Sequence, residues 1–112
     1  MNIEITSDVL LTQLGYTINE SVTLQMQKII DNTIQFDKFS KHLLSLHDSL
    51  VHVNSHLAMS NTNDYLKIKC DESNTKEIIA EFEEIVKHFS NKYNVELEKV
   101  VNKNVYYIIG IK

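Results

Sequence analysis

The stretch that decides the fold runs from Phe36 to Leu57 and reads FDKFSKHLLSLHDSLVHVNSHL. Its apolar residues recur at alternating intervals of three and four positions, which is the a/d spacing of a heptad repeat. The spacing predicts one long helix from Thr33 to Met59 with a single apolar stripe. Seven residues form that stripe: Phe36, Phe39, Leu43, Leu46, Leu50, Val53 and Leu57.

An apolar stripe of this length requires a partner along all of it, because burying apolar surface is what stabilises such a helix. A second copy of the chain can supply the partner, and so can another part of the same chain. We expect a homo-oligomer, with a dimer favoured, in which the seven residues form the interface. The pattern leaves the direction of pairing, parallel or antiparallel, open.

The first thirty residues predict a short strand and two helices. Residues 1–5 alternate between apolar and polar types, as a strand does, and residues 8–14 carry a helical apolar face. A second helix is expected from about residue 18, with Thr17 and Glu20 forming a capping box at its start.

The junction at residues 31–33 leaves two architectures open. Its sequence, Asp-Asn-Thr, contains poor helix formers that are good N-caps, so a break here gives an antiparallel helical hairpin. Neither glycine nor proline marks a turn at this point. We therefore favour one continuous helix from about residue 18 to residue 59.

The C-terminal part predicts a β-α-β-β unit that forms a small sheet. Residues 66–70 alternate as a half-buried strand, residues 75–93 have helical periodicity, and two strands follow over 95–101 and 105–111. We expect the last strand to be central and covered on both faces, because its residues are apolar on both sides. The strands 66–70 and 95–101 are expected to be parallel neighbours through a right-handed crossover.

The whole chain is therefore expected to be one α+β domain over residues 1–112. Residues 1–60 would be its mainly helical, oligomerising part, and residues 65–112 its β-α-β-β head. A chain of 112 residues is long enough to bury one hydrophobic core.

Composition argues against several classes of protein. The formal net charge is −4, and every positive side chain is a lysine, so the chain lacks the basic, arginine-rich surface typical of nucleic-acid binding. No apolar run is long enough to span a bilayer, and no basic amphipathic face suits a membrane surface. With one cysteine, Cys70, and no visible secretory signal, we expect a cytoplasmic protein without disulfides.

The histidines are the most unusual chemical feature. His52 and His56 lie four positions apart on the expected helix, which is a spacing that can hold a transition metal, with His47, Asp48 or Met59 as supplementary ligands. A metal site needs at least one more ligand, so a solvated flank with an Asp48–His52 ion pair is favoured over metal. A third hypothesis makes these histidines a pH switch at the interface.

Support for catalysis is small. Cys70 falls on the apolar face of a strand, beside acidic residues that raise a thiol pKa. The two glycines supply no phosphate-binding loop. We therefore expect a non-enzymatic protein–protein interaction or assembly module without a cofactor, which self-associates through the long helix and has a possible protein partner. The alternative is a metal-binding or pH-responsive regulatory protein that uses the histidine-rich face.

Overall fold

The computed structural model describes residues 6–60 and 62–112, so the strand expected over residues 1–5 lies outside the described residues. These residues form four α-helices, two short 3-10 turns and four strands. The helices are α1 (Ser7–Gln13), α2 (Glu20–Asn32), α3 (Leu43–Val51) and α4 (Lys76–Tyr93). The 3-10 turns are η1 (Phe36–Lys38) and η2 (Ser40–His42). The strands are β1 (Ser55–Met59), β2 (Leu66–Cys70), β3 (Val95–Lys99) and β4 (Val105–Ile111).

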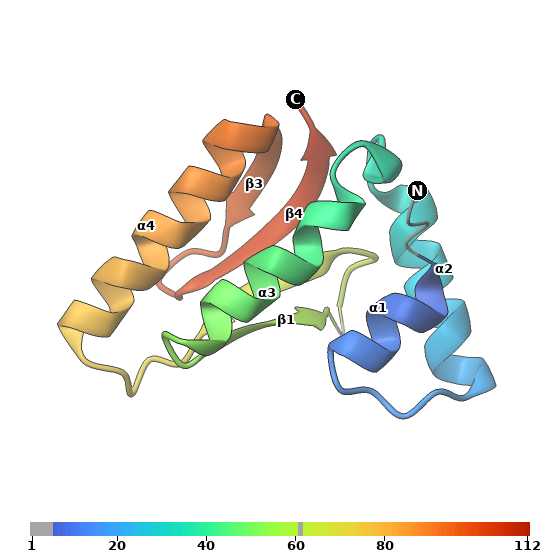
Figure 1. Cartoon of the computed structure of the whole chain (residues 1–112), viewed down its shortest axis with the longest axis horizontal. Coiled ribbons are helices and arrows are strands. Elements are labelled where there is room, and N and C mark those ends of the chain that lie inside the picture. Colours follow the sequence, from blue (N-terminus) through green and yellow to red (C-terminus); the bar gives the residue numbers. More distant parts are fainter. Residues whose placement is uncertain (1–5, 61) are drawn as a thin grey trace.

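The strands form one sheet in the order β1-β2-β4-β3, and every neighbouring pair is antiparallel. Helices α3 and α4 lie across the same face of this sheet, and the hairpin of α1 and α2 lies beside its β1 end (Figure 1). The predicted α+β class is therefore confirmed.

The prediction of one long helix from Thr33 to Met59 is wrong. Two 3-10 turns precede α3, which ends at Val51, and the residues after it turn back into strand β1. Asn54 makes this turn in the left-handed region, at φ +53°, a conformation that asparagine tolerates better than most residues. The segment that was expected to complete the helix instead pairs with β2 in an antiparallel register.

The chain breaks at residues 31–33, as the helical-hairpin alternative required, but the segment that follows does not fold back as a second helix. Helix α2 ends at Asn32, Thr33 has an extended backbone, and its hydroxyl donates a 2.6 Å hydrogen bond to the carbonyl of Ile29. Gln35 then adopts a left-handed conformation before η1. The chain therefore leaves the helix here without forming a helical hairpin with the next segment.

The caps of the helices explain where they begin. The side chain of Asn19 accepts a 2.9 Å hydrogen bond from the Val22 N–H, so α2 begins at Glu20 and the expected box at Thr17 does not form. The Thr75 hydroxyl accepts a hydrogen bond from the Ile78 N–H at the start of α4.

The apolar stripe is the internal core of one chain. None of its seven residues is more than 6% exposed. Phe39 packs edge-on against Phe36 and Phe89, with ring centroids 5.6 and 6.5 Å apart. Because these side chains are covered by α4 and the sheet, the expected dimer interface is wrong for all seven. They are Phe36, Phe39, Leu43, Leu46, Leu50, Val53 and Leu57.

The sheet also differs from the expected β-α-β-β unit. Strand β1 is an additional member, and the strands β2 and β3 are not neighbours because β4 lies between them. The expected central position of β4 is observed, but helices cover only one of its faces.

At Gly110, strand β4 is crossed closely by the backbone of Ile34 from the N-terminal half of the chain. Ile34 bridges to β4 there: its N–H donates to the Ile109 carbonyl at 3.2 Å, and its carbonyl accepts from the Ile111 N–H at 3.0 Å. A Cβ atom at Gly110 would lie 2.5 Å from the Ile34 backbone, and the glycine φ is +138°. Only glycine therefore allows this close crossing.

Among the described residues, no helix combines the length and apolar character needed to cross a membrane.

Candidate functional site

The sheet has one apolar face and one polar face. Leu57, Ile68 and Ile108 point toward the helices and are at most 2% exposed. Side chains of the alternate positions point the other way, because successive residues of a strand face opposite sides. This open face carries Lys67 and Lys69 from β2, together with Tyr107 from β4, which is paired with Lys67.

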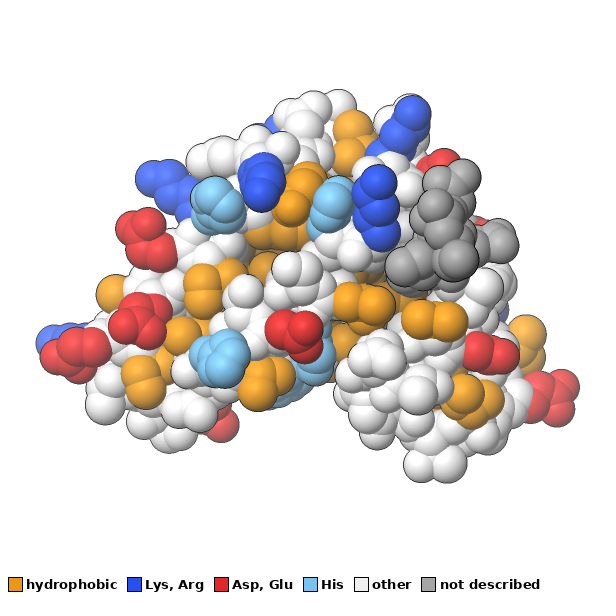
Figure 2. Space-filling model, in the orientation of Figure 1, with side chains coloured by type: hydrophobic (Ala, Val, Ile, Leu, Met, Phe, Trp, Pro, Cys, Tyr) orange, Lys and Arg blue, Asp and Glu red, His pale blue; other side chains and the backbone are white. Residues whose placement is uncertain are grey.

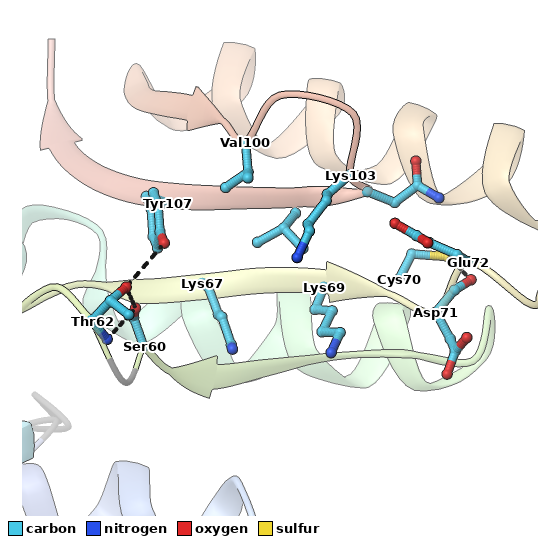
Figure 3. A pocket seen from close by; sticks show the side chains of 12 residues that line it. Ser60, Thr62, Lys67, Lys69, Cys70, Asp71, Glu72, Val100, Lys103 and Tyr107 are labelled. Carbon is cyan, nitrogen blue, oxygen red and sulfur yellow. Dashed lines mark hydrogen bonds between the residues drawn. The ribbon is translucent and has the colours of Figure 1, made fainter.

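A groove of about 440 Å³ runs over the open face, and we call it the lysine groove (Figure 3). It lies over β2 and β4, between the loop that follows β1 and the turn that joins β3 to β4. The residues that characterise it are Thr62, Lys67, Lys69, Lys103, Val105 and Tyr107.

None of the three lysines of the groove forms an ion pair within 4.0 Å in the part of the chain that the structure describes. The ion pair between described residues joins Lys99 Nζ and Glu83 Oε1 at 4.0 Å, and none within that distance involves Lys67, Lys69 or Lys103. Lys67 and Lys69 occupy alternate positions of one strand, so their ammonium groups lie on the same face. The groove therefore concentrates positive charge on a protein whose net charge is −4.

Hydrogen bonds position Tyr107 at one end of the groove. Its hydroxyl lies 3.5 Å from the Thr62 hydroxyl, and the Tyr65 ring lies 6.3 Å from its own, centroid to centroid. Hydrogen bonds with Thr62 and Ser60 lower the pKa of Tyr107, and the ammonium of Lys67 adds to this effect. These groups make this end of the groove polar and rich in donors.

Carboxylates limit the positive region at its other end and along one side. Asp71 and Glu72 line the groove where β2 ends, and Glu98 pairs with Tyr107 across β3 and β4. The N–H of Ser73 donates a 2.9 Å hydrogen bond to Asp71, which lowers the pKa of that carboxyl. The positive region is therefore short.

The two histidines predicted to share a helical face do not share one. Helix α3 ends at Val51, so His52 lies in the following turn and His56 lies on strand β1. The expected Asp48–His52 ion pair is also wrong, since no such pair forms within 4.0 Å. On the side of the molecule seen in Figure 2, the histidine side chains do not form a single cluster.

The described part of the chain brings no three histidine, cysteine or acidic side chains together as a metal site would require. The supplementary candidates are also dispersed: Met59 is buried in the core, whereas Asp48 is exposed on α3. Metal binding by His52 and His56 stays a prediction, and its helical basis is lost.

His47 and His56 have separate roles at strand β1. The Nδ1 atom of His47 accepts a hydrogen bond from the Leu57 N–H at 3.4 Å. His56 projects from the open face opposite Lys69. Partial burial lowers the pKa of His56, and the positive charge of Lys69 lowers it further.

Cys70 is buried at the end of β2, and its Sγ accepts a 3.4 Å hydrogen bond from the Asn74 side chain. No local pattern identifies the lysine groove, because alternating lysines are typical of any solvated strand face. The signal available was the pair Lys67 and Lys69, but the sequence does not show that Lys103 joins them.

Comparison with models of known families, with curated proteins and with solved structures found no match to this chain.

Proposed function

We propose that this chain is a non-enzymatic interaction module that binds a short acidic segment of a partner protein in the lysine groove. One observation carries the proposal. Lys67, Lys69 and Lys103 line one groove on the sheet face without helical cover, and none of them has a carboxylate within 4.0 Å among the described residues.

The groove suits a carboxylate-bearing peptide because its donors are distributed along it. Three ammonium groups can each bind a carboxylate, and the hydroxyls of Thr62 and Tyr107 add donors at one end. The side chain of Val105 gives the groove an apolar contact for the stems of glutamate side chains. A volume of about 440 Å³ accommodates only a few residues.

Charge favours a short acidic peptide over a nucleic acid. A long polyphosphate would meet the carboxylates of Asp71, Glu72 and Glu98 as soon as it left the lysines. Lysine, a compact point charge, binds carboxylates without the two-pronged geometry that arginine offers to phosphates.

Self-association is no part of this proposal. The residues predicted to form a dimer are core residues of a single chain, and whether the chain associates through another surface stays a prediction.

The test is binding of a fluorescent peptide of four glutamates, followed by anisotropy at low and at physiological salt. We expect binding that weakens as salt rises, because exposed ionic interactions are screened. The variant K67E/K69E should bind about tenfold more weakly, which corresponds to about 1.4 kcal/mol.

The matched control is K28E/K41E, which changes the net charge equally at two exposed lysines outside the groove. It should retain most of the affinity. Equal loss in the two variants would show attraction without a site and would overturn the proposal. So would tight binding of oligouridylate with none of the peptide.

A further inference from the structure

The two edges of the sheet differ in how their backbone groups are satisfied. At the β1 edge, the Leu57 N–H donates to His47 Nδ1 at 3.4 Å, and the Met59 N–H donates to the Tyr16 hydroxyl at 2.9 Å. Just beyond the strand, the Gln25 side chain donates to the Ser60 carbonyl at 3.2 Å. Side chains from α2, from α3 and from the loop between α1 and α2 therefore cover this edge.

Among the described residues, the opposite edge, β3, has such cover only at its start, where the Ser90 hydroxyl of α4 donates to the Val95 carbonyl at 2.7 Å. The Val100 N–H donates to the Val105 carbonyl, and the Asn94 carbonyl accepts from the Lys112 N–H, so even-numbered residues of this strand face β4. In an antiparallel pair the alternate residues direct their N–H and C=O groups outward, and here these include Leu97 and Lys99. None of the hydrogen bonds between elements in the described residues reaches either N–H.

A groove of about 590 Å³ follows this open edge between β3 and helix α4, and we call it the edge groove. Val86 and Leu97 supply apolar surface in it, and Tyr106 lies at its base with its hydroxyl donating to Glu83. A helix beside an unpaired strand edge is an arrangement in which proteins accept an extended peptide as an added strand. Unpaired edges of this kind are normally blocked.

We propose that β3 accepts an extended segment of a partner protein as a fifth strand, with lysine or arginine at alternate positions. Glu96 and Glu98 are exposed at alternate positions of β3, Glu96 also lines the edge groove, and neither forms an ion pair within 4.0 Å among the described residues. Opposite charges on directly facing residues stabilise neighbouring strands. A basic residue facing each of these carboxylates therefore fixes the register of the added strand.

The other charges of the edge groove act on the opposite side of that strand. Glu84 carries negative charge there, whereas Lys87 and Lys112 carry positive charge. Lys99 lies 4.0 Å from Glu83 and is partly neutralised by it. These side chains carry both signs of charge and favour neither in the added strand. The carboxylates of Glu96 and Glu98 therefore determine its preference for basic residues.

A second copy of β3 is a poorer occupant. A two-fold antiparallel pairing centred on Leu97 places Glu96 opposite Glu98, and centring on either glutamate places it opposite its own copy. Like charges that face each other directly destabilise a pair of strands. The occupant is therefore a different segment, and this inference does not depend on the lysine groove.

The test uses the peptide KTKTKTK and its analogue N-methylated at every threonine, with amide hydrogen exchange of the complete protein read by NMR. We expect the unmodified peptide to slow exchange at Leu97 and Lys99 at least fivefold. The N-methylated peptide keeps the charge but cannot pair along its backbone, so it should bind at least tenfold more weakly. The covered amides of Leu57 and Met59 serve as internal controls and should not change.

Three outcomes would overturn the inference. One is equal binding of the two peptides, which would mean that charge alone attracts them. Another is an absence of binding at millimolar peptide. The third is slowed exchange at Leu97 and Lys99 that rises with protein concentration without peptide, which would make a second copy the occupant. The variant E96K/E98K should lose binding of the basic peptide, whereas E20K/E77K, altered at exposed sites outside both grooves, should keep it.

Discussion

The two faces of the sheet show how one set of strands divides its work. Leu57, Ile68 and Ile108 form a face that α3 and α4 bury almost completely. The alternate positions of strands β1, β2 and β4 form the other face. Its side chains include His56, Lys67, Lys69 and Tyr107, which are partly or fully exposed. Stability is therefore concentrated on the covered face, and the open face is the one that we propose for binding.

The largest effect is expected under the covered face, for Phe39→Ala. Phe39 is fully buried between two other phenylalanines, so its truncation leaves a cavity and should cost about 3–5 kcal/mol of unfolding free energy. Urea denaturation followed by circular dichroism measures this. Tyr107→Ala on the open face should cost far less, and equal losses would remove the contrast between the faces.

The next effect is expected at the crossing of Ile34 over β4. Gly110→Ala introduces both a positive-φ strain and a clash with the Ile34 backbone, and it should cost about 2–3 kcal/mol. Gly15→Ala is the matched control, because Gly15 has φ +88° but open space around it. Its cost should be about 1 kcal/mol, from strain alone, in the same denaturation experiment. If the two variants lose the same stability, the close crossing does not exist.

A smaller effect is expected at the covered edge. His47→Ala leaves the Leu57 N–H without its acceptor and should cost about 1 kcal/mol. Faster amide exchange at Leu57 than in the unaltered protein would identify the cause. His52→Ala removes an exposed histidine one turn away and should change neither quantity. Unchanged exchange at Leu57 in His47→Ala would contradict the assignment of His47 as the acceptor of the Leu57 N–H.

The smallest effect is a pH dependence that originates on the open face. The folded pKa of His56 lies below the ordinary value of 6.5, because partial burial and then Lys69, His47 and Lys67 disfavour its charge more than Asp71 favours it. The unfolded chain therefore binds the proton first, and stability should fall as the pH drops below about 6.5. His56→Gln should flatten this slope in denaturation curves between pH 8 and pH 5. A slope that is unchanged would assign the titration to another group, such as His42, whose pKa is also lowered by burial and by Lys41.

Sequence alone predicts the elements whose patterns are long or locally punctuated. The helix expected over residues 75–93 differs by one residue from α4, Lys76–Tyr93, because Thr75 caps it and Asn94 ends it in a left-handed conformation. Of the two strands on either side of Asn102, which has φ +62°, β4 has the expected bounds, whereas β3 ends at Lys99, two residues earlier than expected.

The heptad pattern failed because two kinds of structure share it. Val53 and Leu57 continue the helical spacing, yet Ser55, Leu57 and Met59 also alternate as a strand does, and all of them are buried. Pairing with β2 decides between the two, and that contact is remote in sequence. The lysine groove and the edge groove depend on the same long-range pairing, so no local pattern predicts them.

The most direct test of the open face as the binding surface is an NMR titration of the unaltered protein with a peptide of four glutamates. We expect the largest amide shift changes at Lys67, Lys69 and residues 103–107, around the lysine groove. Shift changes confined to α3 and α4, on the covered side of the sheet, would contradict it.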